Sequence, residues 1–272
     1  MTTEAERELG PLEVEPLMRS LAVGTLSGFV AGLIAGGVGS RIAMRIVAIT
    51  AGDADQGAIT DFEATVGVIS ADGTVFLTFL GGMAGALGGL LYLAVRRWLA
   101  DAGRWRGLVF SALLLAIYGS SIIDGDNPDF DEFGSPGLNI AMFASLFIIF
   151  GLLVAPLFER IERGLPRPSL RPSGLGSLAA HGFGLLLVLP ALTSVGFLAQ
   201  QEALLLLLLY PLLAMPLASL ALGRANGGFE RLSDLRGRPL LMAAALALLA
   251  APVIVGVALD ANAIADIYGA DV

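Results

Sequence analysis

Seven runs of mostly apolar residues, each close to the length of a transmembrane helix, make up most of this 272-residue chain. A bilayer core about 30 Å thick is crossed by roughly 20 helical residues, because each residue adds about 1.5 Å. The sequence therefore predicts an all-α fold, a polytopic integral membrane bundle of about seven transmembrane helices. The predicted spans are Leu17–Ser40, Thr74–Val95, Gly107–Ile123, Leu138–Phe158, Ser177–Ala199, Ala203–Leu222 and Pro239–Leu259.

The composition supports this prediction and excludes several kinds of chemistry. Hydrophobic residues make up 56% of the chain and charged residues only 15%, against roughly 25% charged residues in soluble domains. There is no cysteine, no lysine and a single histidine, His181. Disulfides, thiolate metal sites and lysine Schiff bases are thus excluded. We expect no cofactor and no enzymatic activity.

The positions of the arginines predict the orientation of the bundle. Arginine is concentrated in cytoplasmic loops near the ends of spans, so three arginine-rich loops are predicted to be cytoplasmic and the acidic loops between them external. The N-terminus is then cytoplasmic and the C-terminus external. Anionic lipids are the expected partners at the inner face, whereas nucleic acid is not expected, because the basic clusters are short. These arginines are Arg96, Arg97, Arg104, Arg106, Arg160, Arg163, Arg167, Arg171, Arg224, Arg231, Arg236 and Arg238.

A proline-rich cytoplasmic loop divides the predicted bundle into two parts. Prolines favour stiff, extended backbone, so this loop is the best internal boundary. The predicted segments are an acidic cytoplasmic tail (1–16), a four-span glycine-rich half with acidic external loops (17–158), an arginine- and proline-rich linker (159–176), a three-span leucine-rich half (177–259) and an external acidic tail (260–272).

Glycines recur every four residues along the first two spans. Small residues at this spacing form a groove along one helix face and allow a second backbone to approach closely in lipid. We expect the two spans to pack against each other in antiparallel orientation through this face. The predicted packing residues are Gly28, Gly32, Gly36, Gly81, Gly85 and Gly89.

Arg41 and Arg45 are the arginines that the topology places away from the cytoplasmic side. In one geometry a straight helix carries them to the outer interface. In the other, the chain bends within 36–39, Ser40 caps a new helix, and this helix lies along the outer surface. In either geometry the pair can anchor to lipid phosphate or form salt bridges with external acids such as Asp61 and Glu63. The functional alternative is an anion site at the external mouth.

An acidic external loop offers several hard oxygen ligands. Calcium takes six to eight such ligands, although a proline stands where an EF-hand would carry its third side-chain ligand. Three interpretations stay open: an external calcium ion, pairing with Arg41 or Arg45, and a solvated loop. The candidate ligands are Asp124, Asp126, Asn127, Asp129 and Asp131.

His181 lies one turn into the fifth predicted span. A proton relay would need further ionisable groups at the same depth, so we expect a hydrogen-bonded structural histidine.

Two functional hypotheses follow from the whole sequence. The first is a non-enzymatic multi-pass protein of the cell membrane with a packing or interaction role, as an accessory subunit of a larger complex or a homo-oligomer. The alternative is a transporter or channel in which Arg41 and Arg45 attract an anionic solute.

Overall fold

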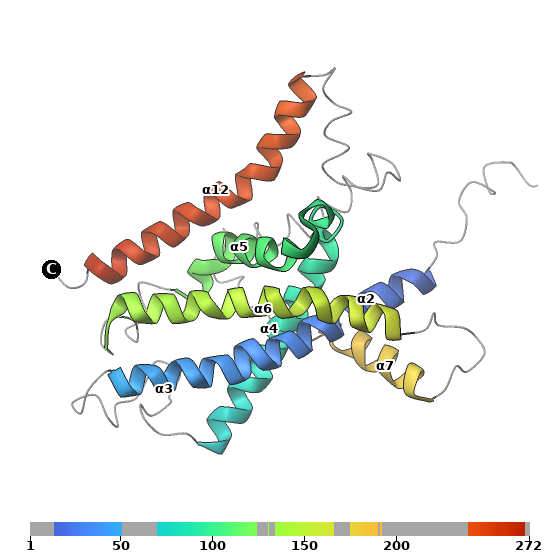
Figure 1. Ribbon diagram of the computed structural model, residues 1–272, viewed down its shortest axis with the longest axis horizontal. Coiled ribbons are helices and arrows are strands. Elements are labelled where there is room, and N and C mark those ends of the chain that lie inside the picture. The colour runs from blue at the N-terminus through green and yellow to red at the C-terminus, as the bar shows by residue number, and fades with distance from the viewer. Residues whose placement is uncertain are drawn as a thin grey trace, which may run out of the picture.

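The computed structural model of the protein describes residues 14–50, 70–123, 130, 134–165, 175–189, 191 and 239–269, and every regular element in these ranges is a helix (Figure 1). The prediction of an all-α fold is confirmed for this part of the chain. The elements are α2 (Val14–Gly32), η1 (Leu33–Gly39), α3 (Ser40–Thr50), α4 (Ala71–Val95), η2 (Ala100–Trp105), α5 (Arg106–Tyr118), η3 (Gly119–Ser121), α6 (Pro136–Gly164), α7 (Leu175–Leu186) and α12 (Pro239–Gly269).

Four helices in the described ranges are long and apolar enough to cross a membrane: Leu17–Thr50, Ala71–Val95, Pro136–Gly164 and Ala250–Gly269. They correspond to the first, second, fourth and seventh predicted spans. The third predicted span contains the 13-residue helix α5, which ends at Tyr118 and is followed by the 3-10 turn η3. The sixth span and most of the second half of the fifth lie outside the described residues.

Helices α6 and α12 extend beyond their predicted ends. Helix α6 continues to Gly164, six residues into the predicted linker, where its last turns carry acids that contact arginines on other helices. Helix α12 continues to Gly269, into the predicted external tail. There Ile267 is buried in a small cluster with Ile123 and Phe130. In both places, contacts with neighbouring segments stabilise helical turns that hydropathy alone does not predict.

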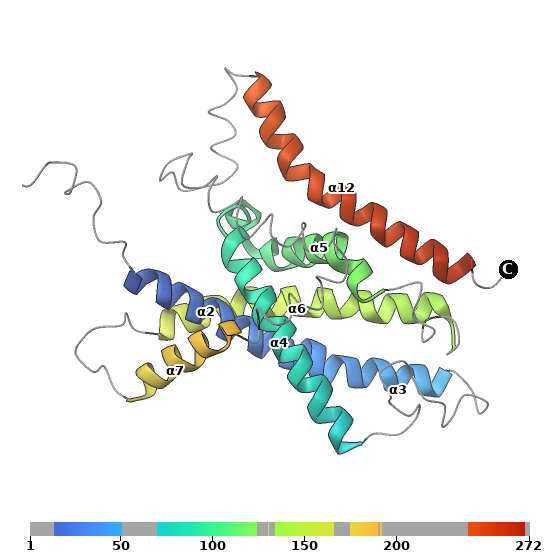
Figure 2. The same ribbon diagram turned by 180° about the vertical axis from the view of Figure 1, so that it is seen from behind.

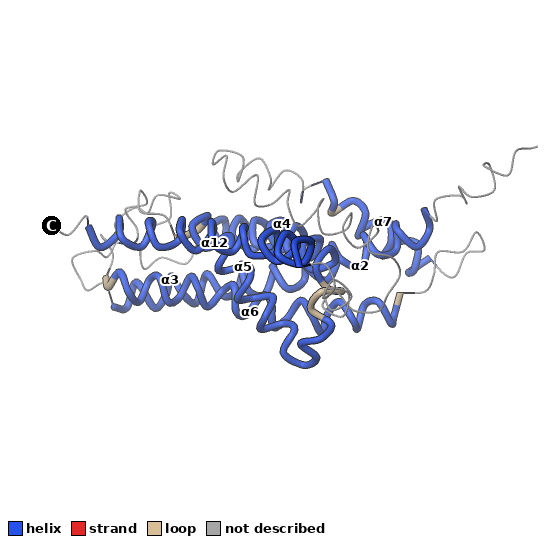
Figure 3. The backbone as a smooth tube through the Cα atoms, turned by 90° about the horizontal axis from the view of Figure 1, so that it is seen from above, coloured by secondary structure: helices blue, strands red, loops and turns tan. Residues whose placement is uncertain are grey.

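The first span is one continuous helix made of α2, η1 and α3, and it runs antiparallel beside α6, while α4 crosses both obliquely (Figures 1 and 2). Seen from above, α4 is almost end-on, and α3 and α6 follow the long axis of the molecule (Figure 3). Helix α12 is inclined to this axis (Figure 1). Helix α7 lies against α2, where the Thr25 hydroxyl donates to the Gly184 carbonyl oxygen at 2.5 Å.

The described helices place their ends at two sides of the molecule. The Arg19 end, as we call it, holds the start of α2, the end of α4, the start of α5 and the end of α6. The Arg41 end holds α3, the start of α4, the end of α5, the start of α6 and the end of α12. A core of apolar and aromatic side chains lies between α2, α4, α5 and α6. In it, the Tyr92 ring makes edge contacts with Phe110 and Phe158 at centroid distances of 5.1 and 5.5 Å.

Candidate functional site

The structure brings the six predicted packing glycines together where α2 and η1 cross α4. A Cβ atom added at Gly28 would lie 2.6 Å from Cα of Gly89, and one added at Gly32 would lie 2.7 Å from Cα of Gly85. A Cβ added at Gly36 would lie 2.7 Å from Cα of Gly81. Each of these distances is too short for a real side chain, so the two backbones are in direct contact.

The π-helical segment η1 changes which residues of the first span face α4. In an α-helix, residues four apart share a face, so the series Gly28, Gly32 and Gly36 would continue with Ser40. A π-helix closes its hydrogen bonds one residue further along the chain. Accordingly, Gly37 contacts Thr78 of α4, and Arg41, four residues later, contacts Gly73 at the start of α4.

The helix passes through 36–39 without a break, as in the first of the two geometries considered for Arg41 and Arg45, and their place at an outer interface stays a prediction. Ser40 does not cap a new helix. Its hydroxyl donates backwards to the carbonyl oxygens of Gly36 and Gly37, the latter at 3.1 Å. Arg41 is partly buried on the side of α3 that meets α4, and Arg45 is exposed.

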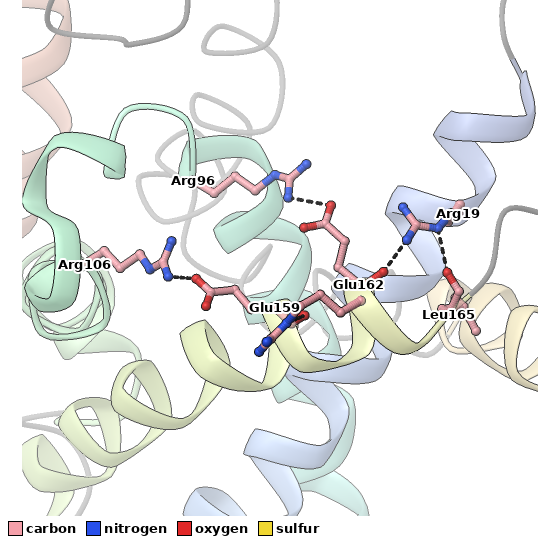
Figure 4. Close-up of polar contacts among 7 residues, drawn as sticks. Arg19, Arg96, Arg106, Glu159, Glu162 and Leu165 are labelled. Carbon is pink, nitrogen blue, oxygen red and sulfur yellow. Dashed lines mark hydrogen bonds and ion pairs between the residues drawn. The ribbon is translucent and has the colours of Figure 1, made fainter.

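A network of charged groups lies at the Arg19 end, around the last turns of α6 (Figure 4). The Arg19 side chain from α2 donates through Nε to the Leu165 carbonyl oxygen at 2.9 Å and through Nη2 to the Glu162 carbonyl oxygen. The final carbonyls of a helix lack partners within the helix and carry partial negative charge. Arg19 therefore caps α6 from a different helix.

Two ion pairs join α6 to neighbouring segments at the same end. Arg96, just after α4, pairs with Glu162 at 2.9 Å, and its guanidinium lies 4.7 Å from the centroid of the Phe158 ring. Arg106, at the start of α5, pairs with Glu159. Glu159 and Glu162 are about one turn apart, so both lie at the end of α6. Through these two ion pairs the end of α6 is linked to the end of α4 and to the start of α5.

At the Arg41 end, a carboxylate from α12 accepts a hydrogen bond from η3, the 3-10 turn that follows α5. The backbone N–H of Ser120 in η3 donates to Asp260 Oδ1 at 2.6 Å. Close by, Asn139 of α6 is buried, and its Nδ2 donates to the Phe130 carbonyl oxygen at 3.3 Å. The first contact joins α12 to η3, and the second joins α6 to the segment at Phe130.

Several predicted site residues lie outside the described ranges: Asp61, Glu63, Asp124, Asp126, Asn127, Asp129 and Asp131. Their pairing with Arg41 or Arg45 and the calcium site stay predictions. Among the described residues, no group of three or more His, Asp or Glu side chains could hold a metal ion. His181 is buried on α7, and its role as a hydrogen-bonded structural histidine stays a prediction.

The sequence interpretation missed the roles of Arg19, Glu159, Glu162 and Asp260. A signal for the glutamates was present, since they are spaced by three residues in a segment otherwise rich in arginine. Asp260 was assigned to an external tail because the hydropathy falls there. No local sequence pattern indicates that it reaches back to η3.

Comparison with known proteins identified no relative: no protein-family model, no curated protein and no solved structure matches this chain.

Proposed function

We propose that the chain is a non-enzymatic multi-pass protein of the cell membrane with a packing or interaction role, as an accessory subunit of a larger membrane complex. The observation that carries this proposal is the crossing of α2 and α4, where the glycines leave backbone against backbone. Direct contact of this kind favours a fixed arrangement of helices over one that slides. A fixed arrangement of helices is what we expect of a protein that presents one constant binding surface to a partner.

The charges at the Arg19 end support the same proposal. Arg19, Arg96 and Arg106 all contact α6, so these three groups serve the contacts between helices. Other arginines at this end are exposed, and we propose that they bind anionic lipid head groups at the inner face, each contributing about 1 kcal/mol near the surface. They are Arg97, Arg104, Arg160 and Arg163.

The test is the assembly state of the full chain after solubilisation in a mild detergent. We expect native gel electrophoresis to show a species larger than the monomer, containing either a second membrane protein or further copies of this chain. The variant Gly85→Ala, which forces α2 and α4 apart, should lose this species. The matched variant Gly182→Ala, at an exposed position with free space around it, should retain it. A monomer with no co-purifying partner would contradict the proposal.

A second candidate function is transport or conduction of an anionic solute attracted by Arg41 and Arg45. One observation favours it: Nε and Nη2 of Arg41 are buried and have no hydrogen-bond partner among the residues that the structure describes. In proteoliposomes, the double variant Arg41→Gln with Arg45→Gln should then abolish anion uptake while the protein stays folded. Unchanged uptake would exclude this candidate.

A further inference from the structure

Four exposed arginines at the Arg19 end form no ion pair with any described residue. The ion pairs at this end belong to Arg96 and Arg106, and they occupy the carboxylates of Glu162 and Glu159. The exposed arginines follow α4, lie in η2 and lie on the last turns of α6. We call them the arginine surface: Arg97, Arg104, Arg160 and Arg163.

The arginine surface carries positive charge that its own contacts do not neutralise. Arg163 Nε donates to the Glu159 carbonyl oxygen at 3.2 Å, and the Arg104 guanidinium lies 4.8 Å from the centroid of the Trp105 ring. A carbonyl group and an aromatic ring are both uncharged partners. In the described part of this end, Asp101 is the exposed acid, so four exposed arginines leave an excess of three positive charges.

An equal negative charge precedes the first described helix in the sequence. Residues 4–13, which we call the acidic segment, contain four glutamates and one arginine, an excess of three negative charges. Helix α2 begins at Val14, the next residue. The charged residues of the acidic segment are Glu4, Glu6, Arg7, Glu8 and Glu13.

The structure places the start of α2 beside the end of α6, which carries half of the arginine surface. Arg19 donates to the carbonyl oxygens of Glu162 and Leu165 (Figure 4). Val14 precedes Arg19 by five residues, which corresponds to about 7.5 Å of helix. Glu8 precedes Val14 by six residues, a length of chain that spans at most about 20 Å. The acidic segment is therefore attached within reach of the arginine surface.

This attachment favours contacts that would be weak between separate molecules. Exposed ion pairs contribute little each, because water and salt screen the charges. A segment joined to its binding surface by a short linker is present at a roughly millimolar effective concentration, so several weak pairs can form together.

We propose that the arginine surface binds the acidic segment of the same chain. The inference goes beyond the proposed function, because it gives these arginines a ligand within the chain in addition to anionic lipid. It depends on the fold of the Arg19 end and on charge, and it does not depend on the assembly state of the protein.

The test traps the contact with a disulfide, since the chain contains no cysteine. The double variant Ala5→Cys with Gly164→Cys places one thiol between Glu4 and Glu6 and the other next to Arg163. Gly164 is exposed, and no atom lies within 4 Å of an added Cβ there. The full chain is reconstituted in nanodiscs of zwitterionic phospholipid with one chain in each disc, so that disulfides form only within a chain. The rate of disulfide formation under mild oxidation is then measured.

We expect the rate to be at least about fivefold higher in 0.1 M salt than in 1 M salt, because the Debye length falls from about 10 Å to about 3 Å. Removing the charges should lower the rate in 0.1 M salt by a similar factor. One charge variant changes the segment, and the other changes α6. They are Glu4→Gln with Glu6→Gln and Glu8→Gln, and Arg160→Gln with Arg163→Gln.

The matched charge controls are Asp266→Asn and Arg45→Gln, at exposed positions of the Arg41 end, and both should leave the rate unchanged. The control cysteine pair Ala5→Cys with Gly269→Cys, also at that end, should react slowly in every condition. Equal rates in the double-cysteine protein and in both charge variants, as expected if the arginines bind lipid alone, would overturn the proposal. A rate that salt does not change would also overturn it. Because each disc holds one chain, neither result bears on the assembly that tests the proposed function.

Discussion

Arg19 near the start of the first span donates a hydrogen bond to the carbonyl oxygen of Leu165, which lies 146 residues further along the chain. This contact and the bond from Arg19 to the Glu162 carbonyl satisfy two of the carbonyl groups that α6 leaves unpaired at its end. The end of α6 is therefore stabilised by a residue that the positive-inside rule treats only as a marker of orientation.

Removing this cap should loosen the last turn of α6. Arg19→Ala leaves the Leu165 and Glu162 carbonyls without their donor, and hydrogen bonds to charged groups contribute about 1.5–3 kcal/mol each. We expect faster amide hydrogen exchange in 161–165 and a lower melting temperature. The control is Arg163→Ala, at an exposed arginine whose Nε donates to the Glu159 carbonyl oxygen of its own helix. Equal exchange in both variants would show that Arg19 does not cap α6.

A methyl group at the crossing of α2 and α4 should destabilise the protein. In Gly85→Ala the new Cβ would lie 2.6 Å from Cα of Gly32, and overpacking of this kind costs about 1–3 kcal/mol. In the matched variant Gly182→Ala no atom lies within 4 Å of the new Cβ, and alanine favours the helix by up to about 1 kcal/mol. Thermal unfolding should therefore shift in opposite directions, and a similar shift in both variants would argue against the crossing.

The carboxylate of Asp260 should matter as a hydrogen-bond acceptor. Asp260→Ala leaves the Ser120 N–H without its partner, at a cost of about 1–3 kcal/mol. Asp260→Asn retains an oxygen at that position and should retain most of the stability. The exposed Asp266 provides the control Asp266→Ala, which should be neutral. If Asp260→Asn is as unstable as Asp260→Ala in thermal unfolding, the charge, and not the hydrogen bond, is what stabilises the contact between α12 and η3.

The glycine face of the first two spans could be predicted from the sequence, because four-residue spacing in a straight helix fixes which side chains share a face. The change in which residues face α4, from the series ending at Gly36 to Gly37 and Arg41, could not be predicted from the sequence. It arises from the π-helical hydrogen bonds of η1, and a glycine-rich run contains no side-chain pattern that distinguishes this geometry from a regular α-helix.

The ends of α6 and α12 show a second limit of sequence reasoning. Hydropathy marks where a helix leaves the apolar core of a bilayer, but it does not mark where the helix ends. Glu159 and Glu162 lie in the predicted linker, and Asp260 lies in the predicted tail, yet all three are helical and contact distant segments. Long-range polar contacts of this kind depend on the tertiary fold.

The packing of α2 against α4 can be tested directly by a disulfide, since the chain contains no cysteine of its own. A Cβ at position 24 would lie 3.4 Å from the Cβ of Leu93, close to the mean of about 3.8 Å between the Cβ atoms of a disulfide. The double variant Gly24→Cys with Leu93→Cys should form an intramolecular disulfide rapidly under mild oxidation in the membrane. The pair Leu93→Cys with Gly269→Cys, at opposite ends of the molecule, should not. Failure of the first pair to cross-link, or equal cross-linking of both pairs, would contradict the fixed glycine crossing on which the proposed function rests.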